Sequence, residues 1–192
     1  EEVYGGGNAA STPGTSVTVN GAFEVNEVFG GGNGKDPISP AVPNPGANVG
    51  YHTYPDNADY DTRNNTDPAK GEVYVYGSGR ASVTIHGGTI HAVYGGSNTK
   101  GNVRQIAVAM LEDSEVCELN VGEAYGGGKS APMDGEAMLD MKCIPGLKYA
   151  YGGAKNADVN GGVTLNITNG TFTQVFGGNN EGGCIYGPIT VN

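Results

Sequence analysis

The sequence has 192 residues, of which 35 are glycine and 37% are hydrophobic, and it carries a formal net charge of −10. A surface this acidic repels nucleic-acid phosphates and anionic membranes, so no binding to nucleic acid is expected. No apolar run approaches the roughly 20 residues of a membrane-spanning helix, so no span is predicted. Disorder is the competing explanation of the glycine content, but repeated strand patterns argue against it.

A six-residue motif recurs six times along the chain. Each copy has a small or branched apolar residue, an aromatic residue and two glycines, and it ends in Asn or Lys. The aromatic residues are Tyr4, Phe29, Tyr94, Tyr125, Tyr151 and Phe176, which places successive copies 25, 65, 31, 26 and 25 residues apart. Self-similarity at a fixed period is typical of solenoids, propellers and arrays.

Strand patterns precede the motif at residues 17–19, 83–85 and 163–167. These runs alternate apolar and polar residues, many of them β-branched, with a period of two, which predicts strands. A period near 25 residues suits one turn of a parallel β-helix. A leucine-rich repeat would need a leucine scaffold, and a propeller blade would need about 40 residues. The apolar runs at 106–111 and 137–141 are either longer strands or short helices, because periodicity does not distinguish the two.

We therefore predict an all-β fold, a right-handed single-stranded parallel β-helix (β-solenoid) with about 25 residues per turn. Equivalent residues should stack in columns about 4.8 Å apart, and the six aromatic rings should form one column. The two glycines should turn a corner where a Cβ atom would clash. An asparagine ladder should run alongside, with Lys129 and Lys155 interrupting it near solvent. Its members are Asn8, Asn33, Asn98 and Asn180.

Residues 34–80 break the period and are predicted to be one irregular insertion rich in Pro, Tyr and Asp. The segment holds six of the ten prolines, which exclude a regular helix or a central strand. Insertions in repeat proteins often form the binding face, so we expect ligand-binding residues here. The candidates are Tyr51, Tyr54, Tyr60, Asp56, Asp59 and Asp61.

Two interpretations of these candidates stay open. Tyrosine gives rigid contact area with a polar tip, which suits the apolar faces of sugars. Alternatively, the tyrosines fold back onto the solenoid and anchor a long loop. The aspartates Asp56, Asp59 and Asp61 are candidate oxygen ligands for calcium, although their spacing is not that of an EF-hand and a solvated acidic loop is the alternative. No other cofactor is predicted.

The cysteines suggest a second column. Cys117 and Cys143 each lie eight residues before an aromatic residue of the motif, so they should be neighbours on adjacent turns. This spacing permits a disulfide, but parallel neighbours point the same way and would strain the S–S torsion. Two buried thiols are therefore the preferred expectation. Cys184 is unpaired in either interpretation.

No catalytic residue is predicted. His86 and His91 lie on one repeat without the neighbours that an activated nucleophile needs. Asp134, Glu136 and Asp140 fall in no repeated column that would make a catalytic carboxylate pair. The alternative is a polysaccharide-active enzyme, a lyase or a glycoside hydrolase, or a calcium-dependent carbohydrate binder on the same scaffold.

The segments VTIHGGTIHAVYGGSN at 83–98 and VTLNITNGTFTQVFGGNN at 163–180 are similar to the repeats of bacterial cell-surface, adhesin-like parallel β-helix proteins. The resemblance covers the regular repeats and leaves out residues 34–80. It implies a secreted or outer-surface protein that binds a glycan or a surface protein, and it carries over no catalytic residue. We expect residues 1–192 to form one β-helix domain from a longer or processed chain.

Overall fold

A computed structural model describes residues 1–21, 24–34, 47–53, 73–112 and 118–192. The described residues contain 14 strands and no helix. Two sheets have six strands each, and a third has two. All strand pairs within the two large sheets are parallel. The predicted all-β class and its parallel repeat architecture are thereby confirmed.

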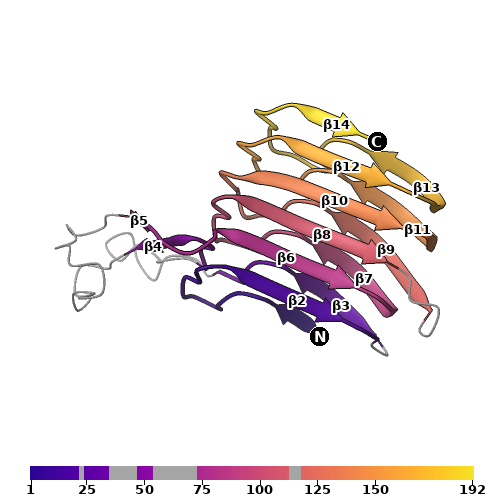
Figure 1. The fold of residues 1–192 in the computed structure, drawn as a ribbon, viewed down its shortest axis with the longest axis horizontal. Coiled ribbons are helices and arrows are strands. Elements are labelled where there is room, and N and C mark those ends of the chain that lie inside the picture. Colours follow the sequence, from indigo (N-terminus) through magenta and orange to yellow (C-terminus); the bar gives the residue numbers. More distant parts are fainter. Residues whose placement is uncertain (22–23, 35–46, 54–72, 113–117) are drawn as a thin grey trace.

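The chain alternates between the two large sheets, so that each new repeat lies beside the preceding one (Figure 1). Every strand of the first sheet, here called the aromatic sheet, ends on the aromatic residue of the motif. It contains β1 (Glu2–Tyr4), β3 (Val25–Phe29), β7 (Gly88–Tyr94), β9 (Leu119–Tyr125), β11 (Ile144–Tyr151) and β13 (Gly170–Phe176). The second sheet contains β2 (Thr15–Val19), β6 (Arg80–Ile85), β8 (Ile106–Glu112), β10 (Glu136–Lys142), β12 (Val163–Ile167) and β14 (Ile189–Val191).

The main core lies between these two sheets. Apolar side chains alternate with more exposed ones along β6 and β10, as a strand with one buried face requires. The apolar runs left open between strand and helix are therefore strands, β8 and β10. The central members of the core are Val28, Ile90, Val93, Val121 and Leu147 from the aromatic sheet and Val83, Ile85, Leu111, Leu139 and Leu165 from the second sheet.

A row of isolated parallel bridges joins the segments that return from the aromatic sheet to the second sheet. Val49 bridges to Thr12 on one side and to Val103 on the other, and Val159 bridges to Met133. Val49, Val103, Met133 and Val159 are buried in a second apolar cluster beneath this row. Neighbouring repeats therefore contact each other along a third line as well as through the two sheets.

The 34–80 segment is divided between this architecture and a projecting hairpin. Val49 is fully buried within the row of bridges, so the residues around it belong to the repeats. β4 (Tyr51–Thr53) and β5 (Val73–Val75) then pair antiparallel and lead away from the sheets (Figure 1). The departure described by the structure thus begins after Gly50, and β6 resumes the repeats at Arg80.

The cysteine prediction is wrong for Cys143, which is exposed and free rather than buried in a column. Cys143 is the single residue between β10 and β11, and its φ of 54° turns the chain from one sheet to the other. A residue at such a turn faces solvent instead of the core. Cys184 is free, as predicted, and it is exposed, whereas Cys117 lies outside the described residues.

Candidate functional site

The six aromatic rings of the motif stack in a single column, as predicted. Neighbouring ring centroids are 4.8–5.1 Å apart, with ring planes within 7–9° of parallel. Because Val28 and Val93 point into the core and side chains alternate along a strand, Phe29 and Tyr94 lie on the outer face of the aromatic sheet. The interior rings Phe29, Tyr94 and Tyr125 are nevertheless fully buried, and Tyr151 nearly so, because neighbouring rings cover their faces.

The first glycine of the motif follows each ring and allows the repeats to approach closely. A Cβ atom on Gly95 would press against the carbonyl oxygen of Gly126 and lie 3.0 Å from the carbonyl carbon of Val108. The amide of Gly95 donates to the carbonyl of Tyr125 at 3.0 Å, and Gly126 bonds to Tyr151 in the same way at 3.1 Å. The clash predicted for a Cβ at this corner is confirmed.

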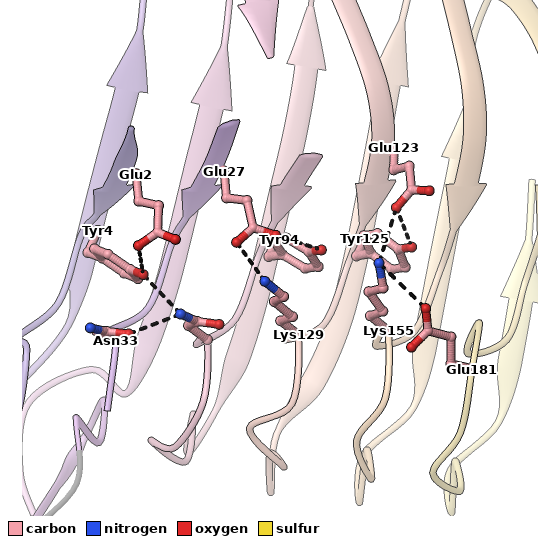
Figure 2. A network of polar contacts seen from close by, with 11 residues as sticks. Glu2, Tyr4, Glu27, Asn33, Tyr94, Glu123, Tyr125, Lys129, Lys155 and Glu181 are labelled. Carbon is pink, nitrogen blue, oxygen red and sulfur yellow. Dashed lines mark hydrogen bonds and ion pairs between the residues drawn. The ribbon is translucent and has the colours of Figure 1, made fainter. Parts of the chain in front are cut away.

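Two rows of mostly polar side chains flank the rings (Figure 2). The first row stands two residues before each ring and comprises Glu2, Glu27, Ala92, Glu123, Tyr149 and Gln174. The second row stands four residues after each ring and comprises Asn8, Asn33, Asn98, Lys129, Lys155 and Asn180. Side chains of the two rows meet across the ring edges.

The asparagine ladder forms over its first three members. Asn33 Nδ2 donates to Asn8 Oδ1 at 2.9 Å, and Asn98 Nδ2 donates to Asn33 Oδ1 at 3.0 Å. Asn98 Nδ2 also reaches the hydroxyl of Tyr4 at 2.9 Å, two repeats before its own. Lys129 and Lys155 separate Asn180 from this ladder. Asn180 Nδ2 instead donates to the hydroxyl of Tyr125 at 2.9 Å, which again lies two repeats earlier.

The lysines of the second row hold carboxylates of the first. Lys129 Nζ lies 2.7 Å from Glu27 Oε2. Lys155 Nζ lies 3.6 Å from Glu123 Oε2 and 3.5 Å from Glu181 Oε1 (Figure 2). The lysine side chains are partly exposed, which agrees with the predicted position near solvent. These pairs fix the direction of two carboxylates that would otherwise rotate freely.

The buried tyrosines act as neutral hydrogen-bond donors. Tyr125 Oη donates to Glu123 Oε2 at 2.9 Å, and Tyr94 Oη points to Glu27 Oε1 at 3.4 Å. Burial raises the pKa of Tyr94 and of Tyr125 far above the usual value, and the adjacent carboxylates raise both further. Both hydroxyls therefore stay protonated at neutral pH and cannot serve as general bases.

An open groove of about 620 Å³ lies over the aromatic sheet beside this network. Small residues create it. In the first row Ala92 stands between Glu27 and Glu123. At the position directly before this row, Gly122 corresponds to Lys148 of the next repeat. Where these two positions carry no long side chain, the surface is hollow.

The groove combines hydrogen-bond acceptors, cations and the side chains of two tyrosines, Tyr94 and Tyr149. Glu27 and Glu123 provide carboxylates, Lys148 an ammonium group and Tyr149 a half-buried ring. His91 lies at the rim, where its Nε2 is 3.0 Å from Glu24 Oε1. Within the described ranges no group of three or more His, Cys, Asp or Glu residues could hold a metal ion. The arrangement suits a polar, uncharged ligand.

Of the residues that line the groove, the sequence pattern pointed to Tyr94, Lys129 and Lys155 as members of the motif, but not to Glu27, Glu123, Lys148 or Tyr149. These four residues occupy positions adjacent to the motif that vary from repeat to repeat, so no pattern marks them. The one available signal was the loss of a large side chain at Ala92 and Gly122 in otherwise equivalent positions.

Of the residues predicted to bind ligand, the structure describes Tyr51. Its hydroxyl donates to Asp134 Oδ2 at 2.8 Å, so Tyr51 ties the base of the hairpin to a neighbouring repeat. This contact matches the anchoring interpretation. The other five candidates lie outside the described residues, and their role in ligand or calcium binding stays a prediction; they are Tyr54, Tyr60, Asp56, Asp59 and Asp61.

The Tyr51 contact predicts a pH-dependent loss of stability in Tyr51→Phe. Burial raises the pKa of Asp134, but hydrogen bonds with Tyr51, Asn102 and Asn160 outweigh it and hold the pKa below its usual value. Because the pKa of Asp134 is lower in the folded than in the unfolded protein, its hydrogen bonds add to the folding stability at pH values above the unfolded-state pKa. This contribution disappears as the pH falls through the folded-state pKa. Tyr51→Phe should therefore cost about 0.5–1 kcal/mol at neutral pH and less in acid.

Urea unfolding at several pH values measures this difference. The matched control is Tyr186→Phe, which removes a hydroxyl from an exposed tyrosine outside the pair and should change little. A cost of Tyr51→Phe that stays constant from neutral to acid pH would show that Asp134 is not the partner that matters.

Comparisons with protein-family models, curated proteins and solved structures found no match to this chain. In the part of the chain that the structure describes, no helix is long and apolar enough to cross a membrane.

Proposed function

We propose that this chain is a non-enzymatic interaction module of a secreted or cell-surface protein and that it binds a glycan. The observation that carries the proposal is the groove over the aromatic sheet, which places the ring of Tyr149 beside the fixed carboxylates of Glu27 and Glu123. In this proposal the two sheets and the row of bridges wind as one right-handed β-solenoid, the hand that parallel crossover connections almost always take.

The groove chemistry supports a saccharide ligand. Sugar hydroxyl groups donate to carboxylates and accept from ammonium groups, which Glu27, Glu123 and Lys148 supply. The apolar face of a pyranose ring packs on an aromatic ring such as that of Tyr149. Because Lys129 and Tyr125 already hold the two glutamates, little side-chain entropy is lost when a ligand binds.

The same contacts favour binding over catalysis. Glycoside hydrolysis needs one carboxyl group as proton donor and a second carboxylate facing it across the scissile bond. Here Glu27 is paired with Lys129, and Glu123 accepts from Tyr125 and lies near Lys155. Both carboxylates are thus committed to the network that flanks the ring column.

Loss of the Tyr149 ring tests the proposal. Saccharides that bind the protein on a glycan array would be titrated by calorimetry into wild type, Tyr149→Ala and Tyr149→Phe. Tyr149→Ala should weaken binding about tenfold, because stacking on the ring is lost, whereas Tyr149→Phe should bind nearly as wild type. Tyr186→Ala is the matched control, since it removes an exposed tyrosine outside the groove and should leave the affinity unchanged.

Three outcomes contradict the proposal. The array shows no bound saccharide, or Tyr149→Ala binds as tightly as wild type. Alternatively, ultraviolet absorbance reveals cleavage of a polyuronate, which makes the chain a lyase. Repeating the titration with calcium and with a chelator separates the groove from the 51–61 candidates, because a calcium-dependent affinity unaffected by Tyr149→Ala would place binding at those residues.

A further inference from the structure

A second hollow adjoins the groove over the aromatic sheet. It measures about 280 Å³ and lies over β9, β11 and β13, which are neighbours in the sheet (Figure 1). Gly122 and Lys148 line both the groove and this second hollow, so the two are continuous. On the basis of the proposed function, we infer that the glycan is a linear oligosaccharide that extends from the groove into the second hollow.

A β-bulge in β11 forms the middle of the second hollow. Ile144 pairs with Gly170 and Leu147 with Phe172, so β11 has one residue more than β13 between these two pairs. Bulges re-aim side chains and are over-represented next to functional sites. β11 is paired with β9 on one side and with β13 on the other, so the bulge lies within the sheet and not at its edge.

Gly146 lies in this bulge, and the fold itself does not require a glycine there. A Cβ atom on Gly146 would meet no atom within 4 Å, and Gly146 does not have a positive φ. Gly122 differs, because a Cβ atom there would lie 2.6 Å from the carbonyl oxygen of His91. Glycine weakens the interior of a strand and often marks a place where a ligand approaches closely. A ligand in the second hollow accounts for Gly146.

The side chains of the second hollow suit sugar hydroxyl groups. Asn120, Thr171 and Thr173 are exposed and provide an amide and two hydroxyls, which both donate and accept hydrogen bonds. Within the described ranges these three side chains make no hydrogen bond to the protein, so they are available to a ligand. Among the described residues that line the second hollow, Lys148 is the one charged side chain. A neutral saccharide therefore finds donors and acceptors here without having to displace an internal contact.

The course of the combined groove selects an extended ligand. Its lining includes residues of β3, β7, β9, β11 and β13, and neighbouring strands are about 4.8 Å apart. A chain of β-1,4-linked hexoses is extended and advances by a similar length per sugar unit, so successive units can contact successive strands. Clefts of roughly 300–1,000 Å³ hold a drug-sized ligand, which has about the size of two or three sugar units. The groove alone thus suits a short saccharide, and the second hollow takes the units that follow in a β-1,4-linked chain.

Calorimetric titration with two-unit and five-unit oligosaccharides tests the inference. The probes are β-1,4-linked oligosaccharides of glucose, of mannose and of N-acetylglucosamine. Wild type should bind the five-unit form of at least one series about tenfold more tightly than the two-unit form. Gly146→Val should remove this difference by weakening the five-unit form alone, because the added side chain fills the second hollow. Its melting temperature should stay unchanged, since the Cβ atom meets no atom within 4 Å and valine favours strands.

Two further variants complete the comparison. Thr164→Val is the matched control, because it also introduces a valine into a strand, but in β12 of the second sheet. It should change neither affinity. Tyr149→Ala should weaken the two-unit and the five-unit forms alike, since both occupy the groove.

Three results overturn the inference: the five-unit form binds no more tightly than the two-unit form, Gly146→Val keeps the difference, or none of the three series binds. The proposed function fails separately, through an array without bound saccharides or through a Tyr149→Ala variant that binds as wild type. If Gly146→Val does not fold, the double variant Asn120→Ala with Thr171→Ala takes its place and should weaken the five-unit form alone. Unchanged five-unit binding in the double variant likewise overturns the inference.

Discussion

Gly126→Ala is expected to destabilise the protein by at least about 4 kcal/mol, which is a large fraction of the free energy of unfolding of an ordinary domain. The added Cβ would press on the carbonyl oxygen of Gly152 and lie 3.0 Å from the carbonyl carbon of Met138. Both contacts are to backbone, which can move only by breaking the hydrogen bonds between repeats. Chemical unfolding followed by circular dichroism measures the loss.

Gly177→Ala is the control for this substitution. Gly177 has the same place in the motif, but a Cβ there would meet only the methyl groups of Ile189 and Val191 at 2.9 Å, which can shift. The expected cost is about 1 kcal/mol or less. Equal losses in the two variants would mean that backbone contact between repeats is not what demands glycine.

Tyr125→Ala should cost about 3–5 kcal/mol, the range for removing a buried aromatic side chain. Its ring is fully buried between Tyr94 and Tyr151, at centroid distances of 4.8 and 4.9 Å. Its hydroxyl also bonds to Glu123 and to Asn180, which would both lose a partner. Thermal and urea unfolding of the purified variant give the free energy of unfolding.

Two further variants separate the contributions. Tyr125→Phe keeps the ring and should cost about 1 kcal/mol, the worth of the lost hydrogen bonds. Phe176→Ala removes a ring that is stacked on one face only, against Tyr151, and should cost about half as much as Tyr125→Ala. If Phe176→Ala is as costly as Tyr125→Ala, stacking from both sides is not the source of the stability.

The sequence predicted those features that recur with the repeat. Tyr94 and Tyr125 stand at the same point of every copy, so a single register places all six rings in one column. The glycines of the motif were predictable for the same reason, because every repeat has the same corner and a Cβ atom does not fit there. Repetition turns a weak local preference into a strong one, because each repeat packs on a copy of itself.

Features that occur once were not predictable. Nothing in the sequence shows that Lys129 pairs with Glu27, which lies two repeats earlier, rather than with a carboxylate of a neighbouring repeat. The choice of partner depends on the diagonal direction that side chains take across the sheet. Val49 falls in the segment predicted to be an insertion, because prolines precede it, although it is buried in the row of bridges. Cys143 was expected to be buried, since the spacing did not reveal that only one residue joins β10 to β11.

Amide hydrogen exchange tests most directly whether the repeated motif is a structural joint rather than an exposed glycine-rich loop. The amides of Gly30, Gly95 and Gly126 donate to the next repeat at 2.9–3.1 Å and should be among the slowest to exchange. Fast exchange at Gly95 and Gly126 in the folded protein would contradict this account.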